Sequence, residues 1–117
     1  MKSIDLTKFR GPSSTQFTGR PQGQQARSEL NIDTLDVDET TPQVEFLIPE
    51  STTSFNPSFY LGLLFDSYLK LGLDKFKEKY SFKIQTSDLT IKRIINKNLE
   101  DGERNAINSL LNKTGLN

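Results

Sequence analysis

Two arginines and a glycine near the N-terminus have the residue types and spacing of an anion-binding corner. Arg20, Gly23 and Arg27 fall within the segment GRPQGQQARSEL. A glycine lets the backbone approach a ligand, and two cations one or two helical turns apart can face the same phosphate or carboxylate. The same residues equally suit a helix start that pairs with nearby acids, so the sequence leaves both interpretations open.

Four acidic residues follow in a turn-rich stretch: Asp33, Asp36, Asp38 and Glu39. They superficially suggest a calcium loop, but the stretch lacks the sixth-position glycine and the closing glutamate of an EF-hand. We therefore predict no metal site and interpret residues 33–42 as a solvated acidic connection. Because a segment of one sign steers a basic partner, these four residues are candidate partner-binding residues.

The chain contains neither cysteine nor histidine. This excludes thiolate nucleophiles, disulfides, histidine-based triads and zinc sites built from these residues. Carboxylates and lysines remain, but no spacing selects a general acid and base, and no phosphate-binding glycine-rich loop is present. We predict a protein that is not an enzyme, with no catalytic residues and no cofactor.

Charge is unevenly distributed although the formal net charge is zero. Residues 1–27 hold five basic residues and one acidic residue, whereas residues 28–56 hold seven acidic residues and no basic residue. Lys92, Arg93 and Lys97 make a modest basic strip, but no aromatic residues alternate with them for base stacking. A general nucleic-acid binder should be more basic, so we expect no nucleic-acid partner.

No segment approaches the roughly 20 apolar residues of a membrane span, and the N-terminus lacks the apolar region of a signal peptide. We therefore expect a cytoplasmic protein without a membrane partner. At 117 residues the chain suits a single domain.

The elements that would position these residues begin with a short strand within residues 3–9. Residues 11–23 are dense in glycine, proline and serine, which predicts a flexible loop with a short strand at 16–18. A short helix is predicted over 24–32, and the apolar run 43–49 predicts a buried central strand.

The best-marked element is a helix that starts at Pro57. Asn56 has the residue type of an N-cap, Pro57 suits the first helical position, and Gly72 lies where the helix should break. Its apolar surface extends well around the cylinder, so the helix is either largely buried or meets a partner. That surface also leaves a homodimer open.

After Gly72 the pattern predicts a short basic helix ending near Tyr80, and then an alternating strand. Ser87 or Asp88 can cap a further helix, which the Asp101-Gly102 pair interrupts before a last helix. This order predicts the α/β class: a single domain over residues 1–117, with a small mixed sheet and three to five helices.

Several short motifs resemble the bacterial STAS-like domain family of uncharacterised function, over roughly residues 14–97. The similar positions are Arg20, Gly23 and the Ala26-Arg27 pair, then the strand Val44 to Ile48 and the Ser58-Phe59 pair. The resemblance implies a STAS-type fold and regulation through protein contact, with a histidine-kinase-like ATPase as the partner.

Classical STAS domains are phosphorylated on a serine at the start of the helix after the central strand. The resemblance therefore implies Ser58 as the candidate acceptor, with Ser54 and Thr53 as neighbours that could substitute for it. Asn56 and Phe59, beside it, become candidate partner-binding residues. The chain departs from the classical Asp-Ser-Ser-Gly motif, because it reads Asn-Pro-Ser-Phe at residues 56–59.

A second hypothesis is a small inhibitor or accessory protein from a phage or another mobile element. Such a protein would occupy the basic groove of a bacterial defence or nucleic-acid enzyme with its acidic segment. An enzyme or a ligand carrier that uses the Arg20 and Arg27 corner is a third.

Overall fold

The computed structural model describes residues 1–10 and 14–114, and it is an α/β fold as predicted. Three strands form the main sheet in the order β1-β3-β5. Their bounds are Lys2–Asp5 for β1, Val44–Ile48 for β3 and Tyr80–Ile84 for β5. The helices are α1 (Arg20–Glu29), α2 (Ile32–Asp36), α3 (Pro57–Lys79) and α4 (Leu89–Thr114), which agrees with the predicted three to five.

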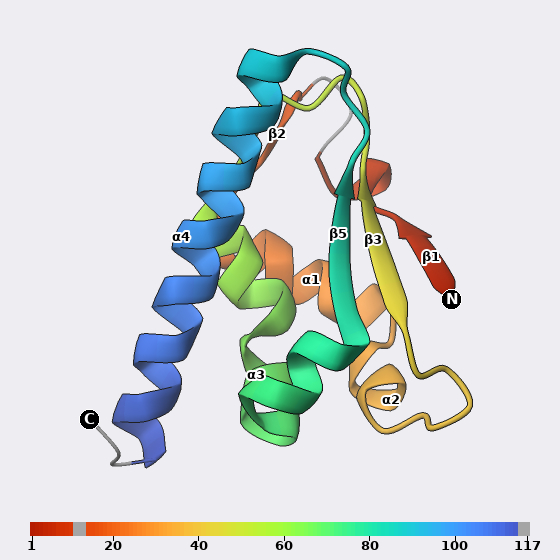
Figure 1. The fold of residues 1–117 in the computed structure, drawn as a ribbon, viewed down its shortest axis with the longest axis vertical. Coiled ribbons are helices and arrows are strands. Elements are labelled where there is room, and N and C mark those ends of the chain that lie inside the picture. Colours follow the sequence, from red (N-terminus) through yellow and green to blue (C-terminus); the bar gives the residue numbers. More distant parts are fainter. Residues whose placement is uncertain (11–13, 115–117) are drawn as a thin grey trace.

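The prediction of a mixed sheet was wrong, because every strand pair among the described residues is parallel. A helix-containing segment carries the chain from β1 to β3, and α3 carries it from β3 to β5, so each strand starts again at the same end. Strands added in one direction by right-handed crossovers place their helices on one face. Figure 1 shows α1, α3 and α4 gathered on that side of the sheet.

The strands alternate between a core side and an open side. Ile4, Phe46 and Phe82 stand in register on the side of the helices. Their neighbours Asp5, Leu47 and Lys83 lie in the next row and point the other way. Parallel sheets are usually covered on both faces, so a sheet with one polar open face is a distinctive feature of this molecule.

The short strand predicted at 16–18 within the loop 11–23 is present as β2 (Gln16–Phe17), which pairs in parallel with β4 (Ser54–Phe55). The predicted loop ends earlier than expected, because α1 already begins at Arg20. Gly19 permits this early start with a φ of 76°. Residues 11–13 of the predicted loop lie outside the described residues.

The helix punctuation around α3 was predicted correctly. Asn56 Oδ1 accepts a hydrogen bond from the Ser58 backbone N–H at 2.7 Å, and Pro57 occupies the first turn. Gly72 has a φ of 77° and breaks the helix, which then continues to Lys79. The kink turns the last two turns toward the start of β5 (Figure 1).

Two other helix boundaries differ from the prediction. Helix α4 continues through Asp101 and Gly102 without interruption. Gly102 is needed there for packing, because a Cβ at this position would lie 2.6 Å from the ring of Tyr60. Helix α2 (Ile32–Asp36) takes up the first four residues of the predicted acidic connection 33–42. No helix among the described residues is long and apolar enough to cross a membrane.

Candidate functional site

The first turn of α3 and the loop before it bring the predicted acceptor residues to the surface. Ser58 is exposed, and so is Thr53, whereas Ser54 in β4 is half-buried. Thr53 is held in place, because its N–H donates to Thr15 O at 2.7 Å and the two hydroxyl oxygens lie 2.8 Å apart. Ser58 is therefore the candidate acceptor with the freest side chain.

The two predicted partner-binding residues beside Ser58 have structural roles. Phe59 is fully buried and packs edge-on against Phe17 and Phe55, with ring centroids 5.1 and 5.2 Å away. It cannot contact a partner without opening the core, so its prediction as a contact residue was wrong. Asn56 is exposed at the surface and caps α3.

The structure does not arrange Arg20, Gly23 and Arg27 as an open anion-binding corner. Gly23 lies against the backbone of α3, where a Cβ would come within 2.2 Å of Phe59 O. The Arg20 guanidinium lies 5.7 Å from the ring centre of Phe65. Arg27 is only 6% exposed, so it has no surface for a ligand.

Arg27 instead forms the centre of a buried ionic network with two of the predicted acidic residues. Its guanidinium lies 2.6 Å from Asp33 Oδ1 and 2.7 Å from Asp36 Oδ2. It also donates to Leu63 O and to Ser67 Oγ. Burial alone would lower the pKa of Arg27, but the hydrogen bonds to Asp33 and Asp36 raise it, so the cation is firmly held.

Asp36 is buried, although it was predicted as part of a solvated patch. Its Oδ1 accepts hydrogen bonds from Ser67 Oγ at 2.7 Å and from the Tyr80 hydroxyl at 2.5 Å. Burial first, and then this bond to the carboxylate, raises the pKa of the Tyr80 hydroxyl above its ordinary value. The network thus joins α1, α2, α3 and β5 from inside the molecule.

The other acidic residues are closer to the prediction. Asp33 is exposed on its far side, and the hydrogen bond from Arg27 lowers its pKa. Asp38 organises a turn by accepting bonds from Thr40, which lower its pKa. Glu39 is exposed. Among the described residues, no group of three or more acidic side chains could hold a metal ion.

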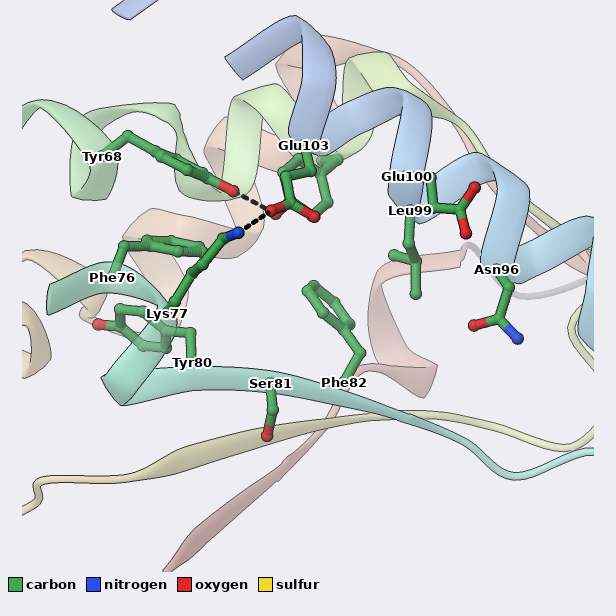
Figure 2. Close-up of a pocket in the computed structure, with 11 residues that line it drawn as sticks. Tyr68, Phe76, Lys77, Tyr80, Ser81, Phe82, Asn96, Leu99, Glu100 and Glu103 are labelled. Carbon is green, nitrogen blue, oxygen red and sulfur yellow. Dashed lines mark hydrogen bonds and ion pairs between the residues drawn. The ribbon is translucent and has the colours of Figure 1, made fainter. Parts of the chain in front are cut away.

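A cleft of about 370 Å³ between β5 and α4 is the site that the sequence did not indicate. Its walls are aromatic and aliphatic, with polar groups at the rim (Figure 2). The lining residues are Tyr60, Tyr68, Phe76, Lys77, Tyr80, Ser81, Phe82, Asn96, Leu99, Glu100 and Glu103.

Two tyrosines in this cleft share a hydrogen bond. The hydroxyl oxygens of Tyr60 and Tyr68 lie 2.6 Å apart. Burial raises the pKa of both groups, to about 12 for Tyr68, so both hydroxyls are protonated at neutral pH. Since one donates to the other, the second hydroxyl proton has no acceptor among the described residues.

The sequence indicated the strand and the helix that form the two walls of the cleft, but not that they lie next to each other. The alternation of Tyr80, Phe82 and Ile84 indicated one strand face. The spacing indicated a helix face made of Ile91, Ile94, Ile95 and Leu99, but Ile94 is exposed and does not belong to it. What it could not show is that α4 packs on α3 and β4 and leaves the edge of β5 open (Figure 1).

The class of protein defined by these features is a small α/β domain with a one-sided parallel sheet and an aromatic cleft at its edge. Comparison with protein-family models, with curated proteins and with solved structures finds no match for this chain.

Proposed function

We propose that this chain is a cytoplasmic, non-enzymatic regulatory module of the STAS-like kind, which binds a histidine-kinase-like ATPase. Its contact surface is the loop 53–58 with the first turn of α3. The observation that carries the proposal is the exposed Ser58 at the start of the helix after the central strand β3. The motif resemblance supplies the class of partner.

The geometry of the first turn describes what a phosphate on Ser58 would meet. Pro57 has no N–H, the Ser58 N–H is bound by Asn56, and the Tyr60 N–H donates to Asn56 O at 3.2 Å. Among the described residues this leaves the Phe59 N–H as the free donor of the turn. The helix dipole favours the added charge. Because a phosphate would find a single free N–H in this turn, it would form few new hydrogen bonds and change the local structure little. Phosphorylation would therefore act by changing the charge that the partner meets.

The modification is tested by intact-mass measurement after incubation with the kinase encoded in the host. We expect one added phosphate, absent from Ser58→Ala and retained in the matched variant Ser54→Ala. No mass gain, or a gain that survives Ser58→Ala, would contradict Ser58 as the acceptor.

Partner binding is tested separately with the tagged protein purified from its host. We expect an ATPase of the histidine-kinase-like class in the eluate, and about a tenfold loss of that ATPase with Thr53→Arg or Ser58→Arg. Glu78→Arg, at an exposed position near the other end of α3, is the control. If the ATPase is retained by both loop variants, the proposed contact surface is incorrect.

The alternative role, an inhibitor that acts through its acidic segment, gains no support from the geometry. Asp36 is buried and Asp33 is bound to Arg27, so fewer free carboxylates face the solvent than the sequence indicated. A surface with that reduced charge would attract a basic groove less strongly.

A further inference from the structure

The outer edge of β5 carries backbone groups without partners. Gln85 N–H donates to Ile48 O at 3.0 Å, which shows that the odd-numbered residues here point their backbone groups toward β3. Because these groups alternate along a strand, those of Phe82 and Ile84 point to the opposite edge. No other described strand pairs with β5 there, and no backbone hydrogen bond to their N–H groups is present among the described residues.

The aromatic cleft lies along this same edge. Phe82 of β5 lines the cleft together with Leu99 and Glu100 of α4, and β5 is the outermost strand of its sheet, so the cleft opens beside the strand that has no neighbour on its outer side. Figure 2 shows Phe82 directed from β5 toward Leu99 of α4, with the open space between the two elements.

The rim of the cleft has an excess of negative charge. Lys77 Nζ and Glu103 Oε1 lie 3.1 Å apart and neutralise each other. Glu100 is exposed on α4 one turn earlier and makes no ion pair with any described residue. A ligand that presents a lysine or arginine at this rim would complete the pairing.

We propose that an extended peptide segment of a partner protein binds here as a fourth strand alongside β5. Its backbone pairs with Phe82 and Ile84, one large apolar side chain enters the cleft, and a basic side chain reaches Glu100. Strand addition of this kind combines backbone hydrogen bonds with pockets for alternate side chains. None of the loop residues 53–58 lines the cleft, and Tyr60 is the residue of the first turn of α3 that does.

The test uses a displayed library of random twelve-residue peptides selected on the full-length, isotope-labelled chain. We expect selected peptides to combine aromatic or β-branched residues with a lysine or arginine. Their addition should shift the amide signals of Phe82 and Ile84. Failure to enrich any peptide, or shifts confined to other surfaces, would overturn the proposal.

Two matched pairs of variants locate the binding. Ile84→Pro removes an edge N–H that β3 does not use, whereas Ile84→Ala removes the side chain and keeps the N–H. We expect about tenfold weaker peptide binding with the proline than with the alanine. Glu100→Lys should weaken binding of basic peptides by a similar factor. Asp66→Lys, at an exposed position that does not line the cleft, should not.

The two charge-reversal variants keep the test decisive if Ile84→Pro does not fold. Glu100 is an exposed residue of α4, so replacing it should leave the fold intact. Equal peptide affinity in Glu100→Lys and Asp66→Lys would reject the proposed site. Concentration-dependent shifts of Phe82 and Ile84 without any peptide would instead assign the edge to a second copy of this chain, which would also reject a peptide partner. Neither result depends on Ser58.

Discussion

Arg27 illustrates how a residue type can be recognised in a sequence while its partner is not. The sequence identified Arg27 as a cation that needs an anion, and Asp36 as an acid. It could not pair them, because the contact depends on α2, a five-residue helix that follows Asn31 in a left-handed conformation. Ser67 and Tyr80 complete the network from 31 and 44 residues away from Asp36. Hydrophobic periodicity reports on neighbours along the chain, so such distant contacts escaped prediction.

Replacing Arg27 should therefore be costly. Arg27→Met would leave the buried Asp36 carboxylate with only Lys70, 3.6 Å away, as a cation. Breaking a buried ion pair by removing one partner typically costs about 3–5 kcal/mol of unfolding free energy. Urea unfolding followed by circular dichroism measures the change. The exposed Glu39→Gln should stay within about 0.5 kcal/mol of the parent protein. A loss below about 1 kcal/mol in Arg27→Met would mean that Asp36 finds another partner or loses its charge.

Elements whose ends are marked by capping or helix-breaking residues were predicted well. Elements whose ends depend on tertiary packing were not. The sequence located the start of α3 because Asn56 and Pro57 act within a single turn. The sequence suggested a break at Gly102, since glycine costs a helix about 1 kcal/mol relative to alanine. The structure keeps α4 continuous, because Tyr60 requires a residue without a side chain there. Glycine thus had opposite meanings at Gly72 and Gly102, and only tertiary contact separates them.

Helices α1 and α3 pack closely at Gly62, and we expect a larger residue there to destabilise the fold. Gly62→Ala would place a Cβ 2.2 Å from Arg20 O and 2.8 Å from Gln24 N, so the two helices must separate. Although alanine favours the helix, we expect a net loss of about 1–3 kcal/mol from this overpacking. Thermal and urea unfolding measure it.

The matched control is Asp66→Ala, an exposed position on the same helix. It should change stability by less than about 0.5 kcal/mol. A Gly62→Ala variant as stable as this control would show that α1 and α3 do not rely on close backbone approach.

For the whole molecule, all three tyrosines lie in the core beside the cleft and the ionic network. Burial raises the pKa of each one, to about 12 for Tyr68 and further for the other two. Because the folded pKa values exceed the unfolded value of 10.0, this contribution to stability is complete below pH 10. It is lost as the pH rises from there through about 12, since the unfolded chain can then ionise.

We therefore expect tyrosinate absorbance to remain absent at pH 10.5 and to appear together with loss of the circular dichroism signal. The chain in urea should titrate near pH 10 and serves as the reference. Substantial ionisation at pH 10.5 with the fold intact would show that at least one tyrosine is open to water.

The ionic network also has a consequence for how the protein is made. During synthesis Arg27 and Asp36 leave the ribosome before their partner, because the Tyr80 hydroxyl that binds Asp36 follows it by 44 residues and lies in β5, the strand that completes the sheet. Until that strand is translated, β3 lacks one of its two neighbouring strands and α3 lacks its contacts with β5. The nascent segment should remain vulnerable to proteases and attractive to chaperones until β5 has been synthesised.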